Sequence, residues 1–391
     1  MTEYFNKNYT KDNIRAIDAK FEAQKIAFSP LVFQAVKALL DLGLLNAISN
    51  SGEKGLTINE VIKQTKVSVY AAEVLLEVAL GMNIVKVLTN QDLHNQHNQY
   101  NKGNQHNKGN QEENRFVLGK IGWFLLEDEL TRVNFNFVND VCYKGAFELT
   151  ESLKTGKPQG LKVFTDEKNT IYEALAGLPQ QVKDSWFAFD HFYSDIGFED
   201  ALPIVFSGSP KKIIDIGGNT AKWALCCCRY DSNVEVLIVD LPGQTKVAEQ
   251  KAAEAGFSGR IKTLACDMLD KQTAIPAGAD VIWMSQFLDC FSPEDISGIM
   301  AKVRAAAGKA TDVYILEPFW DKQRFEAASF SLQATSLYFT CMANGKSKMY
   351  RYEQFAQIIT NAGFEIINAH HNLGSNDYSL LRCRSCRSKE V

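Results

Sequence analysis

Apolar residues in the first part of the chain recur every three or four positions, the spacing of helices that bury one face. Residues 14–48 follow this pattern, and we expect a helix there. A second helix is expected to begin after Thr57, because Glu60 stands three residues later and the two can form a capping box. A turn at 67–70 then predicts a third helix over 71–80.

Two short strand-like runs, 84–88 and 115–118, follow these helices and complete the order of a winged helix. Residues 91–114 lie between the runs, contain almost no apolar side chain and repeat the unit Asn-Lys-Gly-Asn-Gln. Such a tract cannot bury enough apolar surface to offset the entropy of ordering, so we expect a mobile wing tip. Its three histidines do not predict a metal site, because a flexible tract offers no preformed ligand geometry.

After residue 210 the pattern changes to short apolar runs separated by helical stretches, which is typical of an α/β domain. The runs that predict parallel strands are 212–216, 234–239, 261–266, 279–284 and 312–316. Helices are expected between them at 222–229, 245–255 and 293–307. Two final runs, 363–369 and 378–382, are joined by a short loop and predict an antiparallel pair. The fold class is therefore a seven-stranded, doubly wound, Rossmann-like sheet that ends in an antiparallel hairpin.

Three parts of the chain follow from these patterns. Residues 1–118 form the winged-helix-like domain and 201–391 form the α/β domain. Residues 119–200 are mostly helical and rich in aromatic side chains, and we expect some of them to line a substrate pocket.

Composition narrows the possible partners. With 42 basic and 46 acidic residues the formal net charge is −4, so no overall basic field attracts nucleic acid or anionic lipid. No apolar run reaches the length of a membrane span, and the first residues lack the apolar core of a secretory signal. Nine cysteines without such a signal indicate free thiols in a reducing compartment, so we expect a cytoplasmic protein.

Polar residues gather where the expected parallel strands end. The first strand leads through Asp215 to Gly217 and Gly218, and Asp240 ends the second strand about twenty residues later. Glycines at this position let a ligand approach the backbone, and a carboxylate at the next strand end can accept hydrogen bonds from ribose hydroxyls. Asp267 and Ser285 follow the third and fourth strands, so the four strand ends predict one site for a nucleoside-type ligand.

These motifs, in this order and with the N-terminal domain, resemble the class I S-adenosylmethionine-dependent O-methyltransferases. The closer resemblance is to the plant caffeate and bacterial small-molecule group, whose winged-helix domain serves dimerisation. It implies a homodimer, S-adenosylmethionine as cofactor and a small, aromatic methyl acceptor. Carried over residue by residue, the cofactor would be held by Asp215, Gly217, Gly218, Asp240, Leu241, Asp267, Met268, Ser285 and Gln286.

The chain departs from this group at the expected catalytic base. Members with a proton-abstracting histidine place it after the fourth strand, where this chain has Asp289. Asp289 is predicted either to accept the proton, if burial raises its pKa, or to cap the next helix. Glu317 stands at the end of the fifth strand and resembles another active-site acid of the group. His191, just ahead of the α/β domain, is the third candidate, as a substitute base or as a structural histidine.

Three other functions fit parts of the sequence. Without the usual base, methylation of nitrogen or a changed chemistry at the same cofactor site remains an alternative. A DNA-binding regulator would use the winged helix, but its recognition stretch, 67–79, contains no Arg or Lys. An NAD-dependent oxidoreductase would share the sheet and Asp240, but the third glycine of the dinucleotide motif is absent.

Overall fold

The computed structural model describes residues 9–88, 114–194 and 196–386. The chain divides into two compact units, one of residues 12–135 and one that joins residues 136–391 to the start of the chain.

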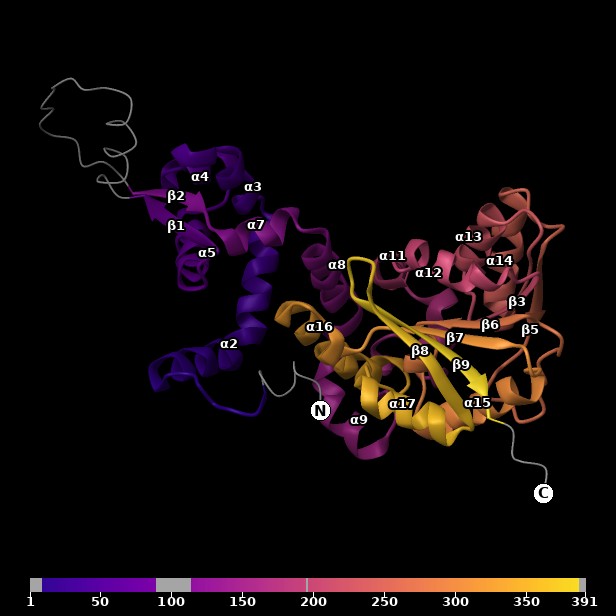
Figure 1. The fold of residues 1–391 in the computed structure, drawn as a ribbon. Helices are drawn as coiled ribbons and strands as arrows, with labels where there is room; N and C mark the ends of the chain where they lie inside the picture. The colour runs from indigo at the N-terminus through magenta and orange to yellow at the C-terminus, as the bar shows by residue number, and fades with distance from the viewer. Residues whose placement is uncertain (1–8, 89–113, 195, 387–391) are drawn as a thin grey trace, which may run out of the picture. The chain divides into compact units, whose positions relative to one another are not determined.

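The smaller unit is helical with one small sheet (Figure 1). Its elements are α2 (Ala16–Asp41), α3 (Leu44–Asn50), α4 (Ile58–Thr65), α5 (Val69–Gly81), β1 (Val85–Leu88), β2 (Arg115–Leu118) and α7 (Lys120–Glu127), with α8 (Glu129–Phe137) at its end. Strands β1 and β2 pair antiparallel, as a wing does. The predicted tract 91–114 lies outside the described residues except for its last residue, Asn114.

In this unit the predicted capping box is confirmed, but the predicted first helix is not continuous. The capping box is present: Glu60 N donates to Thr57 Oγ1 over 3.3 Å, and Thr57 N donates to Glu60 Oε2 over 2.8 Å. The expectation of one helix over 14–48 is wrong, because Gly43 adopts a left-handed φ of 74° between α2 and α3. A residue without a Cβ takes this conformation at little cost, so the chain turns there.

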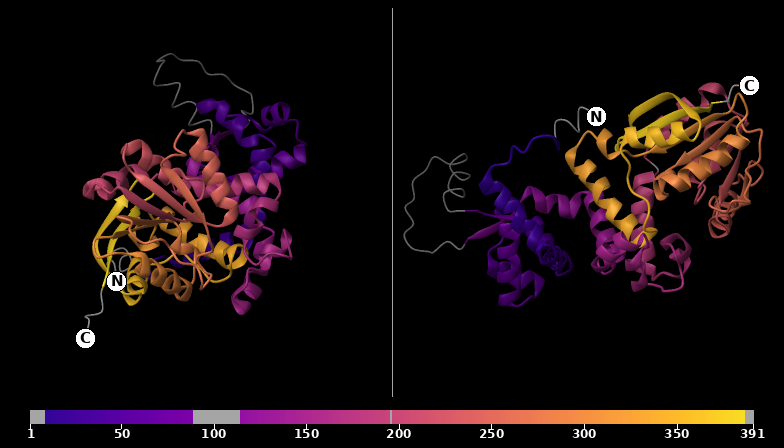
Figure 2. Two further views of the ribbon diagram at one scale, coloured as in Figure 1. Left: turned by 90° about the vertical axis from the view of Figure 1, so that its right-hand side faces the viewer. Right: turned by 90° about the horizontal axis from the view of Figure 1, so that it is seen from below.

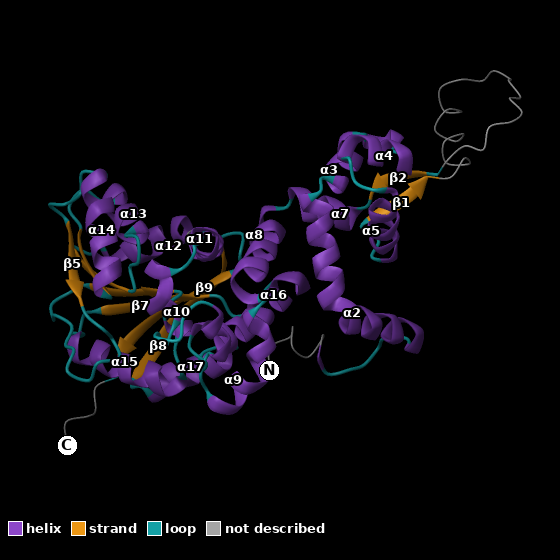
Figure 3. Cartoon of the chain, turned by 180° about the vertical axis from the view of Figure 1, so that it is seen from behind, coloured by secondary structure: helices purple, strands orange, loops and turns teal. Residues whose placement is uncertain are grey.

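The larger unit contains the predicted seven-stranded sheet, in the order β5-β4-β3-β6-β7-β9-β8. The strands are β3 (Lys212–Ile216), β4 (Glu235–Asp240), β5 (Ile261–Ala265), β6 (Val281–Ser285), β7 (Asp312–Glu317), β8 (Phe364–Leu373) and β9 (Tyr378–Ser385). The first five are parallel, and β9 joins β7 and β8 antiparallel. The predicted fold class is confirmed, and Figure 3 shows the strands in orange.

Helices cover both faces of this sheet (Figures 1 and 2). The helices of this unit are α9 (Leu149–Thr155), α10 (Ile171–Ala174), α11 (Gln180–Ser194), α12 (Phe198–Val205), α13 (Lys222–Tyr230), α14 (Pro242–Glu254), α15 (Pro293–Ala306), α16 (Glu326–Tyr338) and α17 (Tyr352–Asn361). Helices α12, α13 and α14 pack on one face with Ile213 and Trp283, and α15 and α17 pack on the other with Ile214 and Ile282. Side chains of a strand alternate between faces, so neighbouring residues of β3 enter different cores.

The strand order reverses at β3, which lies between β4 and β6. In open α/β sheets ligands bind at such a switch point, beyond the carboxyl ends of the strands. The fold therefore places the turns after β3, β4, β5 and β6 at a single edge.

Within the described ranges, no single helix is long and apolar enough to cross a bilayer. Helices α2 and α3 reach that length and composition only as a pair, bent by 58°.

Candidate active site

A cavity of about 1010 Å³ opens at this edge of the sheet. Its walls come from the ends of β3 to β6 on one side and from residues 155–190 and 344–346 on the other. The volume is at the upper end of the range of small-molecule sites, so it has room for a nucleoside ligand and a second small molecule.

Gly217 and Gly218 form a turn after β3 that has no space for a side chain. Gly217 adopts a φ of 77°, and a Cβ there would lie 2.4 Å from the Phe287 ring. A Cβ on Gly218 would lie 2.7 Å from Asp215 Oδ2. The packing of the turn therefore requires glycine at both positions, and Gly217 is the one of the two that lines the cavity.

Asp240 is held in a fixed orientation at the end of β4. Its Oδ2 accepts a hydrogen bond from Asn219 N over 2.9 Å, and its Oδ1 accepts one from Leu241 N over 2.7 Å. Burial raises the pKa of Asp240, and these two hydrogen bonds act in the opposite direction. Each carboxylate oxygen can accept more than one donor, so Asp240 can also bind ligand hydroxyls.

Asp215 lies behind the glycine turn and is buried. Its Oδ2 has no hydrogen-bond partner among the described residues. Burial, with the nearby charge of Asp240, raises the pKa of Asp215 to about 8. Burial therefore favours the protonated form of this carboxyl group over the ionised form.

The ends of β5 and β6 supply the other polar side chains on the sheet side of the cavity. Asp267 lines the cavity, and its Oδ1 accepts a hydrogen bond from Leu269 N over 2.8 Å. Gln286 adopts a left-handed φ of 43°, a conformation that costs free energy and concentrates at functional sites. In the described structure Gln286 Oε1 and Ser285 Oγ are both buried without a hydrogen-bond partner.

The nine predicted cofactor residues therefore come together at one edge. Those that line the cavity are Gly217, Asp240, Leu241, Asp267, Met268 and Gln286. Asp215, Gly218 and Ser285 do not line it but lie in the same strands and turns.

Two of the predicted catalytic residues form a buried acidic pair away from the cavity wall. Glu317 Oε1 accepts hydrogen bonds from Phe287 N and Leu288 N, over 3.2 and 2.9 Å. Burial and the charge of Asp289 raise the pKa of Glu317 well above its usual range, and burial raises the pKa of Asp289 to about 6. Neither is among the residues that line the cavity.

The alternative reading of Asp289 as a helix cap is wrong. Ser292 caps α15, because its Oγ accepts a hydrogen bond from Asp295 N over 3.1 Å. Asp289 instead lies in a short 3₁₀ turn, Leu288–Cys290, and is 4% exposed.

His191 lies in the last turn of α11, and its ring faces the Phe187 ring with the centroids 6.0 Å apart. It does not line the cavity, whereas the preceding residue, Asp190, does. The sequence pattern pointed to His191 and not to Asp190 beside it.

Asn219 was also overlooked, although it directly follows the two glycines. Its Nδ2 donates to Asp190 Oδ2 over 3.0 Å, and its backbone N donates to Asp240. Asn219 adopts a φ of 45°, and its Oδ1 is buried without a hydrogen-bond partner among the described residues. It therefore joins the helical wall of the cavity to the strand ends.

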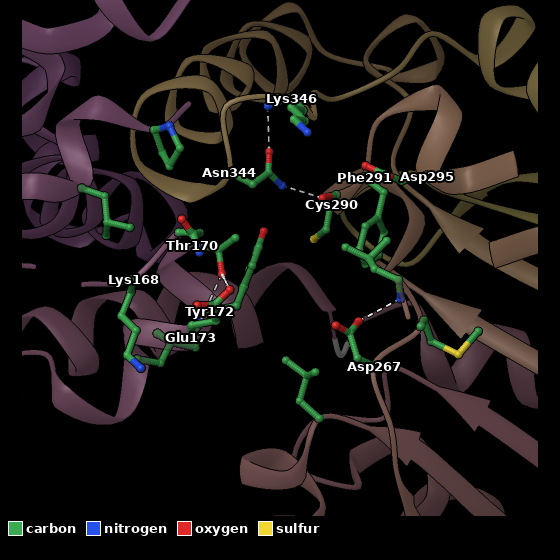
Figure 4. A pocket seen from close by; sticks show the side chains of 18 of the residues that line it. Lys168, Thr170, Tyr172, Glu173, Asp267, Cys290, Phe291, Asp295, Asn344 and Lys346 are labelled. Carbon is green, nitrogen blue, oxygen red and sulfur yellow. Dashed lines mark hydrogen bonds between the residues drawn. The ribbon is translucent and has the colours of Figure 1, made fainter. Parts of the chain in front are cut away.

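The helical wall carries two aromatic side chains among mostly polar residues, and one of them, Tyr172, is labelled in Figure 4. Tyr172 and Trp186 line it, and the hydroxyl end of Tyr172 points toward Cys290 and Asn344. The aromatic richness of 119–200 indicated such a wall, but only the fold identifies which rings belong to it.

Two protein-family models match the chain. Residues 20–93 match the Dimerisation2-like domain, and residues 193–365 match the O-methyltransferase domain. The second match covers the strand ends described above.

Curated relatives are distant in sequence. The L-tyrosine C(3)-methyltransferase of Streptomyces lavendulae is 23% identical over 342 residues, which is 87% of this chain and 85% of the relative. The 3-hydroxy-5-methyl-1-naphthoate 3-O-methyltransferase of Streptomyces sahachiroi is 24% identical over 193 residues, 49% of this chain and 53% of the relative.

Solved structures share the fold. The S-adenosylmethionine-dependent methyltransferase SibL superposes with a TM-score of 0.66 at 21% identity, covering 93% of this chain and 98% of SibL. The O-methyltransferase NcsB1, in complex with S-adenosyl-L-homocysteine and 1,4-dihydroxy-2-naphthoic acid, gives a TM-score of 0.62 at 16% identity. That match covers 90% of this chain and 95% of NcsB1.

Proposed function

This chain belongs to the S-adenosylmethionine-dependent O-methyltransferases, and we propose that it methylates a hydroxyl group of a small aromatic acceptor. One observation carries the proposal: a single cavity joins the polar strand ends to a wall that contains Tyr172 and Trp186. A methyltransferase of this kind needs both halves, because donor and acceptor must meet in one water-poor space.

The strand ends fit S-adenosylmethionine on structural grounds. Gly217 brings backbone without a side chain to the cavity, and Asp240 would hold the ribose hydroxyls. Asp267 and Met268 would flank the adenine, and the unpartnered oxygens of Asn219 and Gln286 would face the methionine end. When bound, the cofactor supplies a methyl group that its sulfonium has already activated.

The protein must then orient the acceptor and assist loss of its proton. Asp289, Glu317 and His191 remain our sequence-based candidates, but none of them lines the cavity. Asp190 does line it, and the hydrogen bond from Asn219 orients its carboxylate. We therefore assign the role of proton acceptor to Asp190.

Methylation of a ring carbon is the second candidate reaction. It is favoured by the relative named L-tyrosine C(3)-methyltransferase, which matches 87% of this chain. The same cavity would serve, because a phenol that has lost its proton is nucleophilic at oxygen and at the neighbouring ring carbons. Nuclear magnetic resonance of the product distinguishes the two, since an O-methyl and a ring methyl group resonate at different shifts.

We further propose that two copies pair through the Dimerisation2-like domain and that the enzyme acts in the cytoplasm. Exposed apolar side chains on α2, among them Ile26 and Leu31, support the first point. No disulfide joins any of the nine cysteines, all of which lie in the described ranges, and this supports a reducing compartment.

Titration calorimetry and product analysis test the activity. S-adenosyl-L-homocysteine should bind the full-length protein, and NAD should not. Incubation with S-adenosylmethionine and a panel of phenols, catechols and amines should yield a methylated phenol by mass spectrometry. Failure to bind S-adenosyl-L-homocysteine would contradict the proposal.

A further inference from the structure

Tyr172 lines the cavity, and its hydroxyl group interacts only weakly with the protein. The residue lies in α10, and its hydroxyl oxygen is buried without an oxygen or nitrogen partner among the described residues; it interacts there with the Cys290 thiol, which is a weak hydrogen-bonding group. A buried hydroxyl without a strong hydrogen-bond partner costs free energy. A ligand that supplies an acceptor atom would remove this cost.

The surroundings of Tyr172 hold its ring in place. Thr170 caps α10, with its Oγ1 accepting a hydrogen bond from Glu173 N over 3.3 Å. The Tyr172 ring meets the Trp186 indole edge to face, with centroids 6.4 Å apart. Trp186 in turn donates from Nε1 to Tyr338 Oη over 2.8 Å. The hydroxyl therefore occupies a defined position.

Tyr172 points toward Asn344, which is already hydrogen-bonded, and toward the weakly interacting thiol of Cys290 (Figure 4). Asn344 donates from Nδ2 to Cys290 O over 2.6 Å, and its Oδ1 accepts from Lys346 N and Ser347 N over 2.9 and 3.0 Å. The Cys290 thiol lies 3.9 Å from Gln286 O as a weak donor. These contacts build a polar wall beside Tyr172 and tie it to the strand end that carries Gln286.

We propose that the Tyr172 hydroxyl is a specificity-determining group that donates a hydrogen bond to an oxygen substituent of the acceptor other than the one methylated. This inference rests on the proposed function and names the acceptor class: aromatic rings that carry two neighbouring oxygen substituents, as catechols do. Burial raises the pKa of Tyr172 well above its usual range, so the hydroxyl keeps its proton and acts as a donor.

Matched pairs of probes test the assignment. We would measure kcat and KM for catechol against phenol, and for 2,3-dihydroxynaphthalene against 2-naphthol, with the wild-type protein and Tyr172→Phe. The wild type should favour the dihydroxy member by about tenfold or more, because a site built for a hydrogen bond rejects an analogue that lacks it. Tyr172→Phe should lose most of this preference through KM, with kcat nearly unchanged. Tyr230→Phe, which changes an exposed tyrosine at the end of α13, is the control.

Thermal melting of the ligand-free variant gives a second readout. Because the hydroxyl has only the weak Cys290 thiol beside it in the described structure, Tyr172→Phe should melt at or above the wild-type temperature. A melting temperature several degrees lower would assign the hydroxyl a structural role and overturn the inference.

The remaining outcomes are also decisive. Equal use of both members of each pair by the wild type, or an unchanged preference in Tyr172→Phe, overturns the role of Tyr172. If S-adenosyl-L-homocysteine binds but no probe is methylated, this inference fails while the cofactor assignment stands. If S-adenosyl-L-homocysteine does not bind, the proposed function fails as well.

Discussion

The side-chain amide of Asn219 donates to the Asp190 carboxylate over 3.0 Å. This contact joins α11, which carries the cavity-lining residue Trp186, to the turn after β3. The backbone N of Asn219 donates to Asp240, so one residue connects the expected ribose site to the expected acceptor site. Asn219 adopts a left-handed φ of 45°, which costs free energy in a residue with a side chain. Such backbone strain concentrates at functional sites.

Asp240→Asn should weaken the binding of S-adenosyl-L-homocysteine by about 1–3 kcal/mol, because the ribose hydroxyls lose charge-assisted hydrogen bonds. Titration calorimetry measures the change. Glu235→Gln, at the exposed start of the same strand, is the matched control and should bind as the wild type does. Equal affinity of Asp240→Asn and wild type would remove Asp240 from the cofactor site.

Asp190→Asn should lower turnover by about 10²–10⁴ once an acceptor is known, since a general base contributes roughly that factor. The hydrogen bond from Asn219 can persist in this variant, so cofactor affinity should change little. Asp289→Asn and His191→Gln should each retain turnover within about tenfold, because neither side chain lines the cavity. A large loss in either of these two, with Asp190→Asn unaffected, would move the proton-accepting role to that residue.

Asp289→Asn should also change the pH dependence of stability. Burial raises the pKa of Asp289 to about 6 in the folded protein, above its value of 3.8 in the unfolded chain. The favourable contribution of the protonated group is complete below pH 4 and is lost as the pH rises through 6, a difference of about 3 kcal/mol. The neutral variant should therefore melt higher than the wild type at pH 8, and the two should converge toward pH 4. Parallel melting curves across this range would show that Asp289 ionises as freely as an exposed carboxyl group.

Charges placed on the exposed face of α2 should disrupt the dimer. Ile26 and Leu31 are 74% and 69% exposed, and an interface that covers them cannot accept a buried unpaired carboxylate. Ile26→Glu with Leu31→Glu should convert dimers to monomers in light scattering. Ile367→Glu, on an exposed position of β8, should leave the dimer intact. A dimer that survives the double change must be formed by another surface.

Much of the fold and half of the site followed from the sequence by itself. The period of apolar residues identified the strands and most helices, because alternation and 3.6-residue spacing are local properties of the chain. The order of the strands then required Asp215, Gly217, Asp240 and Asp267 to meet, since the carboxyl ends of parallel strands share one edge. Gly43, which divides the first helix, shows the limit of this reasoning: a glycine permits a left-handed φ but does not require it.

The acceptor side was decided by the tertiary structure. Asp289 and Glu317 had the chemistry of catalytic acids, yet packing buries them together behind the cavity wall. Asp190 and Tyr172 belong to helices that are remote in sequence from the strand ends. Their position beside the strand ends therefore could not be predicted from the sequence. Which side of a helix faces a cavity depends on what the opposite side packs against, and no local pattern contains that information. The proposed cofactor residues could be predicted because sheet topology brings the strand ends together, whereas the proposed acceptor residues depend on packing between segments remote in sequence.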